Sequence, residues 1–118
     1  MSYVDGFLLP IPKRKIPAYV KMARLGRRVW KEHGALDYNE CIGDDLAPKG
    51  AVPFGRGLRL KPGETVVFAW IVYRSRAHRD RVNARVMKDP RMNSVDPKSM
   101  PFDPRRIVFG GFKTLVSF

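Results

Sequence analysis

The chain has 118 residues, of which 44% are hydrophobic and 29% are charged. This composition excludes a disordered or fibrous protein, and the length fits a single domain over residues 1–118. The net charge is +12, because 23 Lys and Arg stand against 11 Asp and Glu, so polyanions are one partner class to consider.

The apolar segments and the single cysteine bear on the cellular location of the protein. The longest apolar run, residues 66–73, is far shorter than the roughly 20 residues that a membrane-spanning helix needs. The apolar stretch 7–11 follows Asp5 and lacks a small-residue cleavage site, which argues against a signal peptide. Cys41 has no second cysteine with which to form an internal disulfide. We therefore expect a cytoplasmic protein without a membrane partner.

The first part of the chain predicts a strand, a helix and a second strand. Residues 3–9 alternate in the manner of a strand, and Pro10 and Pro12 are expected to end it. Between residues 16 and 33 the apolar side chains recur at steps of three and four, which indicates an amphipathic helix. Residues 36–42 alternate again and are expected to form the second strand.

The predicted first helix has two different sides. Gly26 lies on its apolar side, where the missing side chain would let the helix approach a sheet closely. The opposite side is basic, with Lys21, Arg24, Arg28 and Lys31. This basic side is expected to face solvent.

A long loop and a strongly apolar strand are expected next. Residues 44–63 contain three Pro and four Gly, which is typical of a loop. Residues 65–73 are β-branched and aromatic with almost no polar interruption. They predict a central strand that is buried on both faces.

The last third of the chain predicts one helix and one strand. Ser75 is a suitable N-cap for a helix that runs to about Lys88. Four prolines make the following stretch irregular as far as residue 106. Residues 107–118 are expected to form the last strand, with a bulge or a close backbone approach at Gly110-Gly111.

The order β-α-β-β-α-β predicts a ferredoxin-like α+β sandwich, in which a four-stranded antiparallel sheet carries both helices on one face. In this arrangement the third strand lies between the first and the second. The uncovered face would then expose one alternating set of the apolar strand 65–73, such as Phe68 and Trp70. A patch of this kind needs a cover, for which a second copy of the sheet, a nucleic acid and the long loops are the candidates.

Several segments of the chain carry a family resemblance. They are residues 3–7, 30–38 (WKEHGALDY), 63–90 (which contains SRAHRDRVNARVM), 100–103 and 110–112. Together they resemble the YbaA-like family of uncharacterised proteins, in the dimeric α/β-barrel superfamily. The resemblance implies that two ferredoxin-like subunits bring their sheets together around an enclosed cavity, which makes a homodimer. It implies no reaction.

Two carboxylates are the first candidates for chemistry. With the third strand between its neighbours, Asp5 and Glu40 are expected to lie beside Phe68 or Trp70 on the uncovered face. Carboxylates on an enclosed aromatic face acquire raised pKa values and can act as general acid or base, or orient a ligand. Alternatively they pair with arginine or discourage association between strand edges. The expected ligand-binding residues are Tyr3, Tyr38, Phe68, Trp70 and Asn83.

A histidine is the next candidate. His78 lies on the inner side of the second helix and is the third candidate catalytic residue, with Asn83 one turn on as its partner. His33, His78 and Cys41 are too scattered to predict a metal site, so we expect neither a metal nor a cofactor. Cys41 is expected to face the helices, opposite Glu40.

Two functions remain open from the sequence. In the first, a homodimeric barrel binds a small, partly apolar molecule between its sheets, with proton-transfer or cofactor-free oxygenase or isomerase chemistry as the reactions to consider. In the second, the chain binds RNA or another polyanion through basic helix faces, which would add Arg76, Arg79 and Arg85 to those of the first helix. RNA on the sheet face is disfavoured, because the third strand lacks the basic-Gly-aromatic-Gly opening of RNA-recognition domains.

Overall fold

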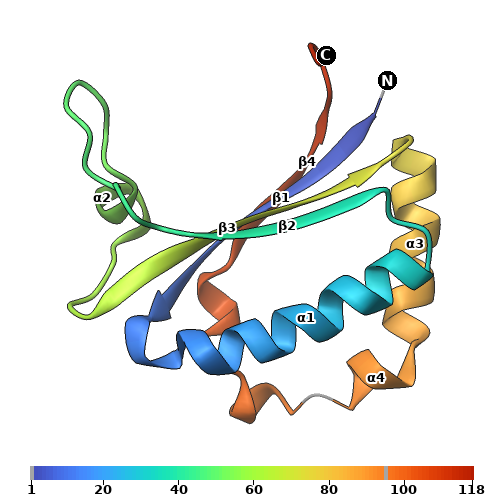
Figure 1. The fold of residues 1–118 in the computed structure, drawn as a ribbon, viewed down its shortest axis with the longest axis horizontal. Helices are drawn as coiled ribbons and strands as arrows, with labels where there is room; N and C mark the ends of the chain where they lie inside the picture. The colour runs from blue at the N-terminus through green and yellow to red at the C-terminus, as the bar shows by residue number, and fades with distance from the viewer. Residues whose placement is uncertain (1, 95) are drawn as a thin grey trace.

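The computed structural model describes residues 2–94 and 96–118. Its elements follow the predicted order, with short additional helices in the connections (Figure 1). Single 3-10 turns lie at Lys13–Lys15, Pro97–Ser99 and Pro104–Arg106. The strands and helices are β1 (Tyr3–Pro12), α1 (Ile16–Glu32), β2 (Asp37–Ile42), α2 (Phe54–Leu58), β3 (Glu64–Tyr73), α3 (Arg76–Lys88), α4 (Pro90–Asn93) and β4 (Val108–Lys113).

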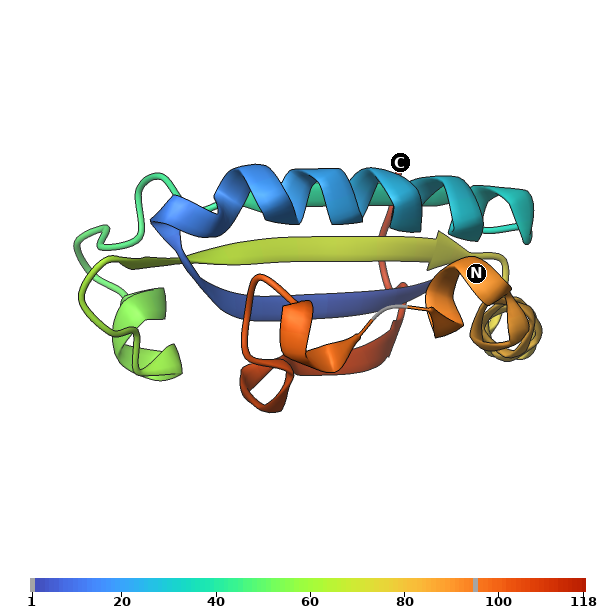
Figure 2. The ribbon, with the colours of Figure 1, turned by 90° about the horizontal axis from the view of Figure 1, so that it is seen from below.

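The four strands form one antiparallel sheet in the order β2-β3-β1-β4. The third strand therefore lies between the first two, as expected. Figure 1 shows the sheet nearly edge-on, with α1, α3 and α4 on one side of it. Figure 2 shows that α1 lies along the β2 edge, whereas α3 is seen end-on beyond the end of the sheet. We call the side with these helices the helix side and the opposite side the open face.

Two hydrophobic clusters fill the space between the sheet and the helix side. The first joins α3 and the end of α1 to the sheet, and the second lies under the beginning of α1. Both draw on the same alternating set of β1 and β3 residues. The buried members are Tyr3, Val29, Ile71, Tyr73, Val82 and Val86 in the first cluster, and Leu9, Ile11, Tyr19, Val67 and Ala69 in the second.

The first strand continues through the two prolines that were expected to end it. β1 pairs with β3 as far as Pro12, but with β4 only as far as Leu8. The Ser2 carbonyl accepts the Thr114 N–H on the β4 side, so even-numbered residues of β1 direct their backbone groups toward β4. The N–H groups that Pro10 and Pro12 lack would have pointed to the β4 side, where no strand of the described residues pairs with this part of β1. The hydrogen bonds between β1 and β3 are therefore unaffected by the two prolines.

The third strand is buried on one face only, contrary to the prediction. Its helix-side residues are buried, but on the open face Phe68 is 45% exposed and Trp70 is partly exposed. Val66 is the exception, at 2% exposure, because Leu46 and Phe54 of the long connection pack near it. The connection thus covers one end of the open face and leaves the middle uncovered.

The two principal helices match their predicted limits closely. α1 ends at Glu32, one residue before the predicted end, and α3 begins after Ser75, whose hydroxyl accepts the backbone N–H of His78 at 3.1 Å. Gly26 allows the predicted close approach. A Cβ atom at this position would lie 2.9 Å from the Tyr38 hydroxyl.

The glycine pair in β4 produces a close approach and no bulge. β1 and β4 pair without a break through Gly110 and Gly111, and β4 ends at Lys113, so the predicted strand 107–118 is too long. The backbone at Gly111 lies directly over the Tyr3 ring. A Cβ atom on residue 111 would lie 2.2 Å from the Tyr3 hydroxyl and 2.7 Å from the ring.

We predict that Gly111→Ala lowers the free energy of unfolding, by about 1–3 kcal/mol as for other overpacked sites. The buried Tyr3 ring would have to move to admit the methyl group. Urea denaturation followed by circular dichroism measures the effect. Gly57→Ala in α2 is the matched control, because a Cβ atom there meets nothing within 4 Å; equal effects of the two substitutions would contradict the prediction.

Candidate functional sites

The two candidate carboxylates do not lie on the open face. In the β1–β3 register Asp5 is opposite Ile71, whereas Trp70 is opposite Gly6. Asp5 therefore shares the helix side with Ile71, and Trp70 lies on the other face. Glu40 also faces the helix side, where it contacts α1. The prediction that the carboxylates lie beside Phe68 or Trp70 is wrong. The sequence shows which residues of one strand share a face, but it does not show the register that decides which faces of two strands coincide.

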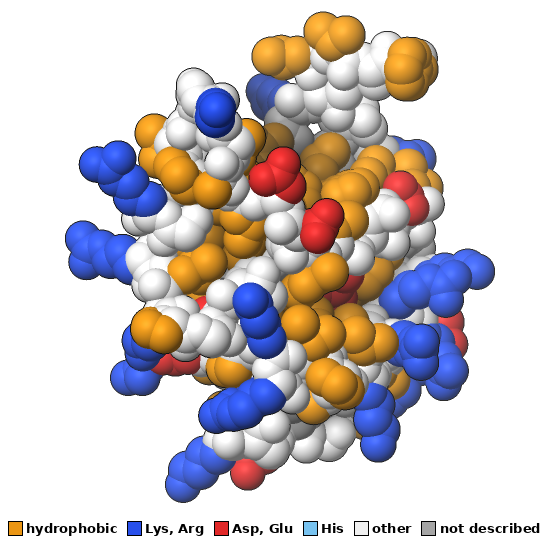
Figure 3. Space-filling model, turned by 60° about the vertical axis from the view of Figure 1, so that its left-hand side comes forward, with side chains coloured by type: hydrophobic (Ala, Val, Ile, Leu, Met, Phe, Trp, Pro, Cys, Tyr) orange, Lys and Arg blue, Asp and Glu red, His pale blue; other side chains and the backbone are white. Residues whose placement is uncertain are grey.

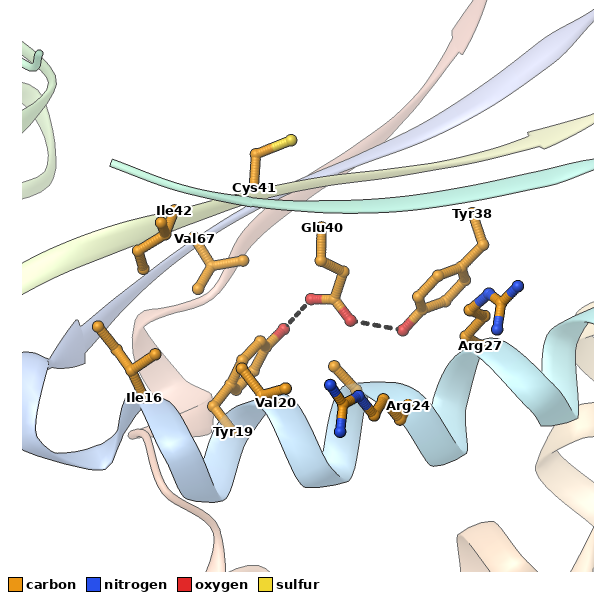
Figure 4. Close-up of a pocket in the computed structure, with 11 residues that line it drawn as sticks. Ile16, Tyr19, Val20, Arg24, Arg27, Tyr38, Glu40, Cys41, Ile42 and Val67 are labelled. Carbon is orange, nitrogen blue, oxygen red and sulfur yellow. Dashed lines mark hydrogen bonds between the residues drawn. The ribbon is translucent and has the colours of Figure 1, made fainter. Parts of the chain in front are cut away.

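Glu40 is held by two phenol groups at the centre of the α1–β2 interface. Tyr38 lies two residues earlier on the same strand and donates a hydrogen bond of 2.7 Å to one carboxylate oxygen. Tyr19 on α1 donates a hydrogen bond to the other oxygen. Figure 4 shows the two rings approaching Glu40 from the strand and from the helix. The three side chains form one unit, which we call the Glu40 triad.

The Glu40 triad separates two hollows. The outer hollow, of about 310 Å³, lies between α1 and β2, and Arg24 and Arg27 are among its lining residues (Figure 4). The inner hollow, of about 390 Å³, lies under α1 between the sheet and the segment 87–107. Tyr19, Ala23, Tyr38 and Glu40 line both hollows.

Burial strengthens the preference of both phenols for the protonated form. The pKa of Tyr19 and that of Tyr38 are raised well above the ordinary tyrosine value, first by burial and then by the hydrogen bond to Glu40. At neutral pH each phenol is therefore a hydrogen-bond donor. Glu40 is the acceptor that both phenols require.

Asp5 belongs to a second polar cluster, at the other end of the helix side. It is 4% exposed, and the Arg79 Nε atom lies 3.7 Å from its Oδ1 atom. Arg79 also donates a 3.1 Å hydrogen bond to the Tyr3 hydroxyl. Nearby, Trp30 and Tyr73 each donate a 3.2 Å hydrogen bond to the side-chain oxygen of Asn83. Of the expected site residues, Tyr3, Asp5 and Asn83 therefore come together here, away from Glu40.

The pKa of Asp5 is raised, because burial penalises the carboxylate more than Arg79 and the nearby hydrogen bonds favour it. The folded state therefore holds this proton more tightly than the unfolded state does. As pH rises from the ordinary value of 3.8 through the raised pKa, this group lowers the free energy of unfolding.

We predict that Asp5→Asn becomes more stable relative to wild type as pH rises over that window, because the amide carries no charge to bury. Thermal denaturation of both proteins at a series of pH values measures the difference. Asp103→Asn is the control with the opposite sign, and its window lies below pH 3.8, since hydrogen bonds from Arg105 lower the pKa of Asp103. A pH-independent difference between Asp5→Asn and wild type would contradict the prediction.

His78 lies apart from the Glu40 triad, whereas Cys41 follows Glu40 directly in β2 and is among the lining residues of the outer hollow. His78 is 4% exposed, and its Nδ1 atom accepts the backbone N–H of Arg74 at 3.0 Å. Burial lowers the pKa of His78, and the charge of Arg74 adds to this effect, so the ring is neutral at physiological pH. The side chain of Asn83, its expected partner, accepts from Trp30 and Tyr73 instead. Cys41 points away from the helices (Figure 4), which corrects its predicted direction.

Two structural findings concern metals and membranes. Within residues 2–94 and 96–118, the side chains of His, Cys, Asp and Glu do not gather in groups of three or more that could hold a metal ion. Over the same residues, no helix combines the length and the apolar character that a membrane crossing requires.

The open face has a hollow at its centre. Across the sheet, Trp70, Gly6 and Gly110 form one row, and the two glycines contribute no side chains. The rows on either side carry large apolar residues. They are Val72, Val4 and Phe112 on one side and Phe68, Leu8 and Val108 on the other. The resulting hollow measures about 530 Å³, and none of its lining side chains is ionisable.

The basic charge of the chain is not gathered on one helix face. Arg79 was expected on the outer side of the second helix, but it contacts Asp5 and Tyr3 instead. Arg91 forms a salt bridge with Asp89, and Arg106 forms one with Glu64. Figure 3 shows lysines and arginines on both margins of one side of the molecule, with hydrophobic side chains between them.

Tyr19 is the site residue that the sequence analysis missed. It lies among the apolar residues that recur between positions 16 and 33, and that pattern alone predicts a packing role. The available signal was that a tyrosine on the apolar side of a helix has a hydroxyl group that needs a hydrogen-bond partner. This signal was weak, because it does not say which residue the partner is. Glu40 on a neighbouring strand is that partner.

Residues 2–104 match a family described as protein of unknown function (DUF1428). The chain belongs to this family. It is also 40% identical over 116 residues to the uncharacterized protein YbaA of Escherichia coli (strain K12), with 98% of both chains covered. The same figures hold for the protein of that name in Shigella flexneri. The resemblance to the YbaA-like family is therefore confirmed.

One solved structure has a similar overall shape. The de novo designed protein Foldit4 superimposes with a TM-score of 0.49 at 11% sequence identity, covering 97% of this chain and 99% of that chain. A similarity at this level carries no functional meaning.

Proposed function

We propose that the protein is a homodimeric, ferredoxin-like α/β barrel that binds a small, partly apolar molecule between its paired sheets. The observation that supports this is the open face, with its apolar rim and central hollow. Phe68, Val108 and Phe112 are 45%, 53% and 61% exposed in the single chain. Covering one such side chain completely is worth about 1.5–3 kcal/mol, so a second open face would gain stability by packing against the first.

The glycine row explains why pairing would enclose a cavity. Large side chains on both sides of Gly6 and Gly110 would meet their counterparts first, and the glycines would remain apart. Two such hollows facing each other would form one closed space. The volume of about 530 Å³ on a single sheet already falls within the range of small-molecule sites, about 300–1,000 Å³.

The lining of this hollow favours binding over acid–base chemistry. The indole N–H of Trp70 is the one side-chain hydrogen-bonding group among the lining residues. Asp5 and Glu40, which were the candidate catalytic residues, lie on the helix side. The ligand would therefore be largely apolar, with at most one acceptor directed at Trp70.

We predict that Phe68→Glu converts a dimer into a monomer, because the substitution places a charge in the apolar rim of each copy. Light scattering coupled to size-exclusion chromatography at micromolar concentration measures the mass. Val52→Glu is the control, since Val52 is 72% exposed in the long connection and should leave the dimer intact. A wild-type protein that is monomeric under these conditions would refute the homodimer.

We predict that Gly110→Val abolishes binding of the neutral dye prodan, which has a carbonyl acceptor and no hydrogen-bond donor, and leaves the fold intact. A Cβ atom at residue 110 meets only the Phe112 ring, at 3.8 Å, so the valine occupies the hollow without a clash. Dye fluorescence reports binding, and circular dichroism reports the fold. Gly57→Val makes the same change in open space and should bind like wild type; equal binding by both variants would place the dye elsewhere.

The polyanion hypothesis stays a prediction from the sequence. The net charge of +12 supports it, but no single basic face gathers the arginines that it invoked. We therefore prefer the small-molecule hypothesis, for which the open face offers a defined site.

A further inference from the structure

We propose that each chain has a second binding site, inside the subunit at the Glu40 triad. This site would take a neutral, mainly apolar molecule with one hydrogen-bond donor. It lies on the helix side and is built from one chain, so it does not depend on the pairing of open faces.

The inner hollow has the size and the lining of a ligand site. Its volume of about 390 Å³ falls within the range found for small molecules. Glu40 is the one charged residue among its lining side chains. Four of the others are methionines, whose flexible thioethers adapt to apolar molecules of different shapes. These are Met22, Met87, Met92 and Met100.

Glu40 has the capacity to bind such a molecule. A carboxylate can accept about four hydrogen bonds, and in the described residues the side-chain bonds to Glu40 come from the two phenols. Each phenol uses a different oxygen, so each oxygen retains a free lone pair. Glu40 is partly buried, and a carboxylate that has lost part of its hydration gains stability from each donor that replaces the lost water. A donor group on a bound molecule would supply this.

The surroundings of Glu40 favour a neutral donor over an ammonium group. Arg24 and Arg27 line the outer hollow, on the other side of the same carboxylate (Figure 4). Two guanidinium groups on that side of the carboxylate would repel a cation bound to it. A hydroxyl or N–H group on an apolar body meets no such barrier and carries no charge into the cavity.

The helix is shaped to hold the triad in place. Glycine in the middle of a helix is less favourable than alanine, because it loses more conformational freedom on folding. At Gly26, however, an alanine Cβ would lie 2.9 Å from the Tyr38 hydroxyl. The missing side chain leaves room for this phenol to stand against Glu40. Tyr38 in turn fixes the direction in which the carboxylate presents its free lone pairs.

The test compares two ligands that differ in one donor. 2-Naphthol carries a hydroxyl donor, and 2-methoxynaphthalene has the same ring system without it. Isothermal titration calorimetry, at a pH where the naphthol is neutral, gives both dissociation constants. Because a hydrogen bond to a charged group is worth about 1.5–3 kcal/mol, wild type should bind 2-naphthol about tenfold more tightly or better. Equal affinities would overturn the proposal.

Variants locate the site. Glu40→Gln should remove most of the preference for 2-naphthol, whereas Glu32→Gln, which alters an exposed carboxylate paired with Arg91, should retain it. Gly110→Val should also retain it, because that substitution fills only the hollow of the open face. Loss of 2-naphthol binding in Gly110→Val would place the ligand between the sheets and overturn the second site, while leaving the proposed function intact.

A further variant covers the case in which Glu40→Gln does not fold. Ala23→Leu adds bulk to the wall that the two hollows share and leaves the Glu40 triad unchanged. Binding of both naphthalenes should weaken at least tenfold. Unchanged affinity in a folded Ala23→Leu protein, judged by circular dichroism, would contradict the site.

Discussion

The pairing of β1 with β3 determines which surface each side chain of the sheet occupies. A shift of one residue in this register would exchange the two faces of one strand relative to the other. With Gly6 opposite Trp70 and Asp5 opposite Ile71, the carboxylate enters the helix side and the indole remains on the open face. The polar cluster around Asp5, the apolar hollow and the separation between them follow from this one alignment.

The sequence predicted the elements well because they depend on local chemistry. The N-cap at Ser75 and the helical spacing from residue 16 place both long helices within about a residue of their observed ends. The effect of Pro10 on the length of β1 could not be predicted in the same way. Whether a proline ends a strand depends on whether its missing N–H faces a partner, and that depends on the length of β4.

The candidate site was harder to predict, because it depends on contacts between distant segments. Glu40 was found as an acidic residue on a strand, and Tyr38 as its neighbour. The partner phenol of Tyr19 comes from α1, whose position over β2 is set by packing around Gly26. No spacing within the sequence encodes that position. The prediction that Cys41 faces the helices was wrong for the same reason.

The prolines of β1 have a consequence for how copies of this chain can associate. Among the described residues, no strand pairs with β1 on the β4 side beyond Leu8. An unpaired strand edge of this kind can recruit a strand from another molecule. Pro10 and Pro12 remove the donors from this edge, so it cannot template a continuous ladder. Growth of fibres along this edge is thereby disfavoured.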